Sequence, residues 1–186
     1  MHEFPAQTAL APGQTPTRVL LAMVLLALAV SGCNARPKHE TPDVQLLTAP
    51  ELKSRLSQLR EPLTVVHVWA TTCVPCGEEF PRLMRFREAY AGRGVPMILV
   101  SADPPAQKAR VANYLAERGA LSPSYIIDNP NESFIDVLCT NWSGGMPASF
   151  FFGPGGELRQ WWEGKAEYEK YRTTADALLK QTSERR

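Results

Sequence analysis

The chain has 186 residues, of which 44% are hydrophobic and 21% are charged, and this is the composition of a folded globular protein. Lysine and arginine (20) nearly balance aspartate and glutamate (19), so the strongly basic surface typical of nucleic-acid-binding proteins is excluded and no nucleic-acid partner is expected. Four cysteines are too few for a small disulfide-stapled scaffold, and the chain is long enough to build its own hydrophobic core.

The N-terminal residues 1–32 are predicted to be a lipoprotein signal peptide. Val19–Val30 is a run of twelve apolar residues behind Arg18, shorter than the roughly 20 residues of a membrane span but typical of a signal-peptide core. The following Val30-Ser31-Gly32-Cys33 resembles the lipobox of bacterial lipoproteins, in which cleavage precedes a lipidated cysteine. This resemblance implies a lipid anchor on Cys33 and a location in the bacterial cell envelope, facing the periplasm, with the choice between inner and outer membrane left open. An uncleaved anchor helix is the alternative, and both place the remainder outside the cytoplasm, where disulfides persist.

A tether is expected over residues 33–47, which are polar, contain prolines and show no apolar period, and a folded domain is expected over residues 48–186. In chain order, the apolar patterns of this domain first predict a helix from Thr48 or Ala49 to about Leu59, a strand over 63–70, a helix over 76–90, a strand over 95–102 and a helix over 104–118. They then predict a strand over 125–128, one or two helical turns over 131–138, hairpin strands over 148–152 and 157–163, and a helix over 167–181. Strands that alternate with helices and end in an antiparallel hairpin predict an α/β fold with a mixed central β-sheet flanked by helices.

A Cys-x-x-Cys pair, Cys73 and Cys76, lies between the first apolar strand and the following helix. The same spacing occurs in zinc sites and structural disulfides. Zinc would need two further ligands, and only Cys139 with His67 or His39 is left, so no metal is expected. At a helix N-terminus the free N–H groups favour the thiolate of Cys73, whereas Cys76, one turn inside, would be shielded and would resolve a mixed disulfide. The pattern therefore indicates a redox dithiol that needs no cofactor.

The motif and its surroundings resemble the TlpA/ResA/CcmG-like thiol–disulfide oxidoreductases, which have the thioredoxin fold, over roughly residues 48–182. The matching segments are Val68–Thr71, Cys76–Pro81, Gly145–Phe152, Gly155–Glu157 and Gly164. The resemblance implies a thioredoxin-like fold, a membrane-anchored protein disulfide reductase, and extracytoplasmic protein substrates with disulfides or thiols, apocytochrome c among those of the family. It also implies a redox donor in the membrane.

The resemblance also assigns roles to individual residues. Pro147 corresponds to a cis-proline that faces the dithiol and presents the backbone of Met146 to a substrate peptide. Glu79 corresponds to an acid that tunes thiol pKa values or moves protons, although a solvated helix carboxylate is the alternative. Substrate contacts are expected from four residues around the motif: Trp69, Val74, Pro75 and Met146.

Two residues depart from the family pattern. His67 lies two residues before Trp69, where thioredoxin has a buried aspartate, and it could transfer a proton to or from Cys76. A hydrogen-bonded core histidine is the alternative. Cys139 is left without a partner if Cys33 is lipidated; it could be a third redox thiol, but we favour a small buried hydrophobic residue.

Three other functions compete with the reductase. In a thiol peroxidase, a proline would be expected seven residues before the reactive cysteine, where this chain has Val66, and a resolving cysteine as near as Cys76 would be unusual. A Sco-type copper chaperone would have its cysteines spaced by three residues and a distal histidine, whereas here the gap is two and no histidine follows His67. A structural lipoprotein with an inert disulfide is the third alternative.

Overall fold

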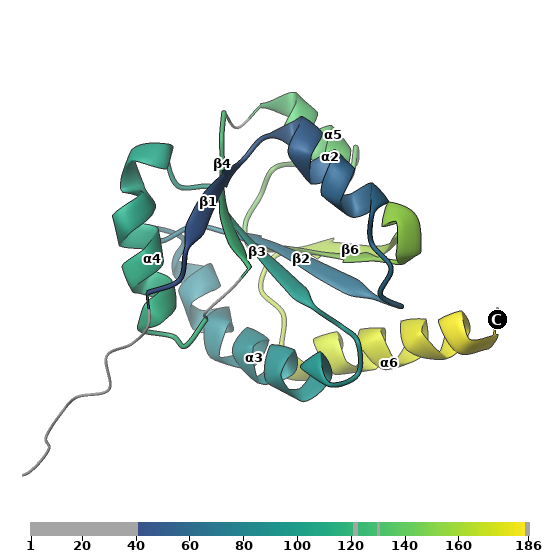
Figure 1. The fold of residues 1–186 in the computed structure, drawn as a ribbon. Coiled ribbons are helices and arrows are strands. Elements are labelled where there is room, and N and C mark those ends of the chain that lie inside the picture. The colour runs from purple at the N-terminus through teal and green to yellow at the C-terminus, as the bar shows by residue number, and fades with distance from the viewer. Residues whose placement is uncertain (1–40, 121–122, 130, 185–186) are drawn as a thin grey trace, which may run out of the picture. The chain divides into compact units, whose positions relative to one another are not determined.

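The computed structural model describes residues 41–120, 123–129 and 131–184, so the predicted signal peptide and Cys33 lie outside the described residues. The described residues form a six-stranded sheet in the order β1-β4-β3-β2-β5-β6, with helices on both faces (Figure 1). The strands are β1 (Val44–Leu47), β2 (Thr64–Trp69), β3 (Met97–Ser101), β4 (Ser124–Ile127), β5 (Ala148–Phe152) and β6 (Leu158–Glu163). The helices are α2 (Ala49–Ser57), α3 (Val74–Ala91), α4 (Lys108–Ala116), α5 (Glu132–Leu138) and α6 (Tyr168–Glu184), with short 3-10 turns at Pro105–Gln107 and Pro154–Gly156.

The sheet is mixed, which confirms the predicted α/β architecture. Strands β1, β4, β3 and β2 run parallel, β5 is antiparallel to β2, and β6 is antiparallel to β5. All six residues of β2 and all five of β5 are buried, because helices cover both faces of the sheet. This explains why both strands read as continuous apolar runs instead of alternating ones.

One boundary of the predicted domain is wrong. Residues 44–47, assigned to the tether, form the edge strand β1 and pair with β4. Val44 and Leu47 are buried while the two residues between them are exposed, so this strand lacks the strict alternation by which short strands are identified. The folded domain therefore begins before Thr48, which serves as the N-cap of α2.

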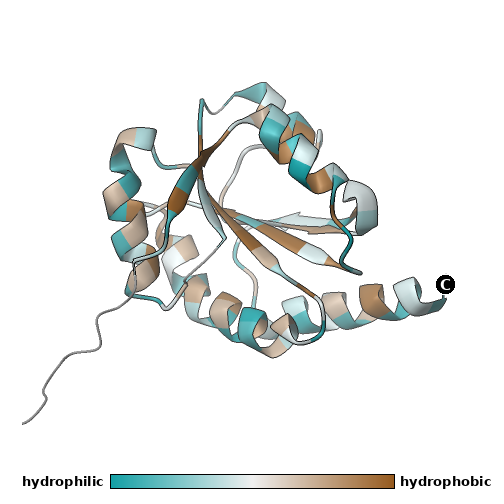
Figure 2. Ribbon diagram, in the orientation of Figure 1, coloured by the Kyte–Doolittle hydropathy of each residue, from teal (hydrophilic) through white to brown (hydrophobic). Residues whose placement is uncertain are grey.

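Two separate cores hold the layers together. On one face, an α3/α6-side cluster joins Val65 and Trp69 of β2 to residues of α3, α4 and α6. On the other face, an α2/α5-side cluster joins Val66 and Val68 to residues of α2 and α5. Figure 2 shows strongly apolar strands between helices in which apolar and hydrophilic residues alternate along the chain. Within the described part of the chain, no helix combines the length and the hydropathy needed to cross a membrane.

This topology defines the edge at which the site lies. The chain leaves β2 and β3 at their carboxyl ends, whereas β5, being antiparallel, begins at that same edge. Segments 70–76, 101–103 and 143–147 therefore meet there, although they are far apart in the sequence.

Candidate active site

The two cysteines of the motif have different environments. Cys73 is the N-cap of α3 and is disulfide-bonded to Cys76. The Cys76 N–H donates a hydrogen bond to Cys73 Sγ (3.2 Å), and the Gly77 N–H donates to the Cys73 carbonyl (3.1 Å). Cys73 is half-buried, whereas Cys76 is completely buried. As predicted, Cys73 is the accessible sulfur, and it lies where backbone N–H groups and the positive end of a helix stabilise a thiolate.

The surface beside Cys73 is apolar. Val74 is 72% exposed and Pro75 is also exposed, so both residues between the cysteines face solvent. Met146 is half-buried at the same edge. These three predicted substrate contacts are therefore accessible to a partner.

The predicted substrate contact at Trp69 is wrong. The Trp69 side chain is fully buried, with its ring centroid 5.1 Å from that of Phe80 and 4.9 Å from that of Tyr114. Tyr114 comes from α4, and it covers the surface that the indole would otherwise offer to a substrate. Trp69 thus supports the dithiol loop from within the α3/α6-side cluster.

The loop before β5 is held in an unusual conformation. The Met146–Pro147 bond is cis, as predicted. In the β2–β5 register Val68 pairs with Ala148, so Pro147 lies beside the end of β2 at the dithiol edge. Gly144 has φ +85°, the left-handed conformation that favours glycine, and the Gly164 N–H donates to the Pro147 carbonyl (2.7 Å).

A buried carboxylate, which the sequence interpretation missed, fixes the segment before Cys73. Asp103 accepts hydrogen bonds from the Thr71 N–H (2.8 Å), the Thr71 hydroxyl (2.5 Å) and the Ser101 hydroxyl (2.7 Å). Asp103 is almost fully buried and follows β3, the parallel neighbour of β2. The sequence signal that could have identified Asp103 is its position, with Ser101, at the carboxyl end of a predicted buried strand. The Cys-x-x-Cys motif follows the carboxyl end of the neighbouring parallel strand, so both lie at the same edge of the sheet.

Glu79 is a buried acid one turn beyond Cys76, so the alternative of a solvated carboxylate is wrong. Its Oε1 accepts hydrogen bonds from the Ala166 N–H (2.9 Å) and the Tyr171 hydroxyl (2.8 Å), whereas Oε2 is buried without a hydrogen-bond partner among the described residues. Burial raises the pKa of Glu79 above its ordinary value, and the two hydrogen bonds oppose this only in part. Burial thus makes the Glu79 carboxyl group a stronger proton acceptor than a solvated glutamate.

His67 is connected to this acid through two hydroxyl groups. His67 Nδ1 lies 2.9 Å from Ser149 Oγ, and Ser149 Oγ lies 2.6 Å from the Tyr171 hydroxyl that donates to Glu79. Burial lowers the pKa of His67 to about 3, so the imidazole is neutral at physiological pH. Burial also raises the pKa of Tyr171 well above its ordinary value. The predicted histidine therefore lies in a hydrogen-bonded chain that ends at Glu79, and no local sequence pattern identified Ser149 or Tyr171 as its other members.

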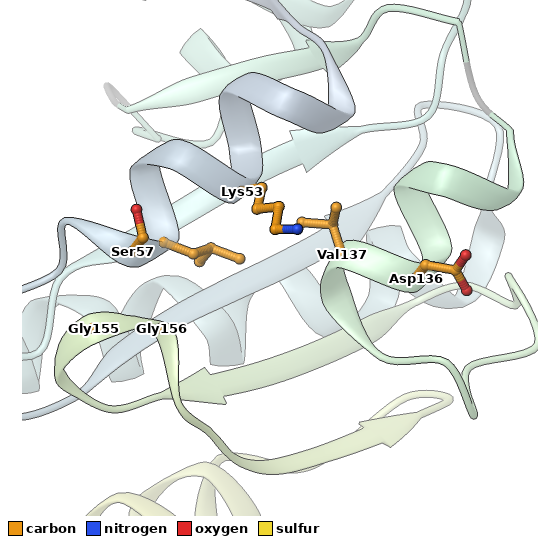
Figure 3. Close-up of a pocket in the computed structure, with 7 residues that line it drawn as sticks. Lys53, Ser57, Asp136, Val137, Gly155 and Gly156 are labelled. Atoms are coloured by element: carbon orange, nitrogen blue, oxygen red, sulfur yellow. The ribbon is translucent and has the colours of Figure 1, made fainter.

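The remaining candidates lie away from the dithiol. Cys139 is buried in the α2/α5-side cluster, on the opposite face of the sheet from Cys76. A hollow between α2, α5 and the turn after β5 is lined by Lys53 and Asp136, both exposed (Figure 3). This turn follows the last residue of β5, whereas Pro147 precedes the first, so the hollow lies at the opposite end of the strand. Across the described ranges, no group of three or more His, Cys, Asp or Glu side chains is arranged to hold a metal ion.

Comparison with known proteins agrees with this geometry. Residues 37–161 match the model of the AhpC/TSA family. The chain is 23% identical over 97 residues to sporulation thiol-disulfide oxidoreductase A of Bacillus subtilis, covering 52% of this chain and 56% of that protein. It is 28% identical over 123 residues to the thiol-disulfide oxidoreductase ResA of Oceanobacillus iheyensis, covering 64% of this chain and 60% of that protein. The chain thus spans less than two thirds of the length of these two relatives.

Solved structures show the same fold. A thiol:disulfide interchange protein of the thioredoxin family from Chlorobium tepidum superposes with a TM-score of 0.55 at 21% identity, covering 68% of this chain and 84% of that one. A thioredoxin-related protein from Neisseria meningitidis serogroup B gives a TM-score of 0.55 at 24% identity, with 66% and 88% covered. The predicted thioredoxin-like fold is confirmed.

Proposed function

Because the chain belongs to the AhpC/TSA family and has a thioredoxin-like fold, we propose that it is a thiol–disulfide oxidoreductase whose substrates are other proteins. The observation that carries this proposal is the asymmetry of the dithiol. An accessible Cys73 at a helix N-terminus is paired with a completely buried Cys76. An inert structural disulfide has no need of an exposed apolar rim such as Val74 and Pro75 beside one of its sulfurs.

The proposed reaction transfers two electrons through a mixed disulfide. The Cys73 thiolate attacks one sulfur of a substrate disulfide, so that a new S–S bond forms and the other substrate sulfur leaves as a thiolate. The Cys76 thiolate then attacks Cys73 Sγ and releases the second substrate thiol. The substrate is reduced to a dithiol, and the Cys73–Cys76 pair is oxidised to the disulfide.

In this reaction Glu79 is proposed to take the proton from Cys76. A completely buried thiol loses its proton reluctantly, because burial disfavours the charged thiolate. Glu79, one helical turn away and equally buried, has a carboxyl group whose pKa is raised by burial, which makes it a better acceptor for this proton than a solvated carboxylate.

The direction and location of the reaction form the finer part of the proposal. We propose a protein disulfide reductase that faces the periplasm, is anchored to the cell envelope by lipid on Cys33 and is re-reduced by a dithiol donor in the membrane. Support comes from the lipobox-like segment ending at Cys33 and from the resemblance to membrane-tethered reductases. Apocytochrome c is one candidate class of substrate.

Reduction of insulin disulfides, driven by dithiothreitol, tests the activity. The wild type and the Cys139→Ser control should accelerate precipitation of the insulin B chain, and Cys73→Ser should not. Equal rates with Cys73→Ser would overturn the proposal, and so would faster turnover of hydrogen peroxide than of insulin, which would favour the thiol peroxidase. Membrane attachment is tested separately by Cys33→Ala, which should abolish incorporation of labelled palmitate.

A further inference from the structure

The two oxygens of the Glu79 carboxyl group differ in their partners. Oε1 accepts from a backbone N–H at Ala166, which cannot turn away, and from the Tyr171 hydroxyl. Oε2 is buried and has no hydrogen-bond partner among the described residues. A proton that binds this group without displacing a donor therefore binds Oε2.

The hydrogen bond that Tyr171 donates to Glu79 determines the hydrogen positions of the two groups behind it. A neutral imidazole has one N–H, and a hydroxyl donates one hydrogen. The single hydroxyl hydrogen of Tyr171 is used in the bond to Glu79, so Ser149 must be the donor in the Ser149–Tyr171 hydrogen bond. Ser149 then has no hydrogen left to donate to His67, so the hydrogen of the His67–Ser149 bond is on His67 Nδ1. All three donors thus point along one chain, from His67 through Ser149 and Tyr171 to Glu79.

The structure brings these four residues together from four elements. His67 and Ser149 are directly paired residues of β2 and β5, Tyr171 lies on α6, and Glu79 lies on α3. Each of the four is buried, and Tyr171 has no exposed surface. Four polar side chains buried at the interface between the sheet and two helices carry a substantial desolvation cost, which argues for a role beyond packing.

We propose that Tyr171, oriented by Ser149 and His67, is a positioning residue for the dithiol reaction: it occupies Oε1 of Glu79 together with the Ala166 amide and so leaves Oε2 as the oxygen that takes up and releases the proton. This inference rests on the proposed role of Glu79 in proton transfer. It adds a defined proton-carrying atom and three residues that determine it.

Two charged groups near Glu79 must be considered in its titration. Arg82 of the same helix and Lys170 of α6 both act to lower the pKa of Glu79, and both remain in the variants below. The Tyr171 hydroxyl also acts in this direction, because it donates to the charged form. Its removal should therefore raise the pKa of Glu79 by about one pH unit, a tenfold change in proton affinity, which is the effect of one hydrogen bond to a charged group.

Infrared difference spectroscopy of the disulfide form measures this directly, because neither Cys73 nor Cys76 titrates in that form. The protonated carboxyl band of Glu79 is identified by its absence in Glu79→Gln. With the proton on Oε2, the C=O oxygen is Oε1 and accepts two hydrogen bonds. Tyr171→Phe should then move the band to higher wavenumber and raise the titration midpoint. Ser149→Ala should move both in the same direction by less.

Tyr90→Phe is the matched control. It removes another buried hydroxyl from the α3–α6 interface, one that donates to Asp176, and it should leave the Glu79 band and midpoint unchanged. A Glu79 band that stays in place in both Tyr171→Phe and Ser149→Ala would place the proton on Oε1 and overturn the inference. If Tyr171→Phe fails to fold, Ser149→Ala alone decides, because it deletes one oxygen atom.

The outcome is separable from the proposed function. If the band shifts as expected while Glu79→Gln keeps the wild-type pH profile for insulin reduction, the positioning of Glu79 is upheld and its role in proton transfer is refuted. If Glu79→Gln alters that profile while the band never moves, the role of Glu79 stands and the positioning by Tyr171 is refuted.

Discussion

Removal of the Asp103 carboxylate should destabilise the fold and loosen the segment that carries Cys73. In Asp103→Ala the Thr71 N–H loses its acceptor, and the Thr71 and Ser101 hydroxyls lose theirs. An unpaired backbone donor costs about 1–3 kcal/mol, whereas each hydroxyl can rotate toward another acceptor and lose about 0.5–1 kcal/mol. Since the substitution also removes the cost of burying a charge, we expect a net loss of about 3 kcal/mol in the free energy of unfolding.

Urea denaturation of the disulfide form, followed by tryptophan fluorescence, measures this loss. Asp136→Ala is the control, because Asp136 is exposed on α5, and its effect should stay within about 0.5 kcal/mol. In the reduced protein, Asp103→Ala should also change the alkylation rate of Cys73, which lies two residues beyond Thr71. A loss below about 1 kcal/mol with an unchanged alkylation rate would refute the assignment of Asp103 as the residue that holds this segment.

Three further predictions concern ionisation and thiol reactivity. The pKa of Glu79 is higher in the folded protein than its unfolded value of about 4.5, so the fold loses stability as the pH rises from the unfolded pKa through the folded one. Glu79→Gln lacks this loss. In urea denaturation, its stability relative to wild type should therefore be higher at pH 8 than at pH 5. The pKa of His67 is about 3 in the folded protein and 6.5 in the unfolded chain, so below pH 6.5 the unfolded chain binds a proton that the folded protein does not. The free energy of unfolding therefore falls as the pH is lowered from 6.5 toward 3. Between pH 6.5 and 4 the wild type should lose about 2–3 kcal/mol more than His67→Gln, and equal losses would contradict a buried neutral imidazole. With limiting iodoacetamide, mass spectrometry of the reduced protein should find Cys73 labelled before Cys76 and Cys139, and earlier labelling of Cys139 would reverse the assignment.

The features predicted correctly from sequence depend on residues that are neighbours along the chain. The apolar run of β2 and the helix that follows it are local patterns, and the placement of Cys73 at their junction follows from them. The strand β1 was missed for a complementary reason. Its four residues have little pattern of their own, and they become a strand by pairing with β4, about 80 positions later.

The polar network of the site depends on strand register, which sequence reasoning did not supply. Ser149 contacts His67 because the two are paired across β2 and β5, and Asp103 reaches Thr71 because β3 is the parallel neighbour of β2. Trp69 was misassigned as a substrate contact because its cover, Tyr114, comes from α4. The motif and the family resemblance thus identified the two cysteines and Glu79, whereas the partners Ser149, Tyr171 and Asp103 required the three-dimensional arrangement.

The central claim, that Cys73 attacks a disulfide of another protein and Cys76 resolves the product, is tested most directly by trapping the mixed disulfide. Reduced Cys76→Ser protein is incubated with a disulfide-bonded peptide, quenched with acid and mapped by mass spectrometry without reduction. The claim predicts one peptide equivalent bound covalently to Cys73, no adduct in Cys73→Ser, and rapid release in the wild type. An adduct on Cys139, or none on Cys73 under conditions in which the wild type is oxidised by the same peptide, would contradict it.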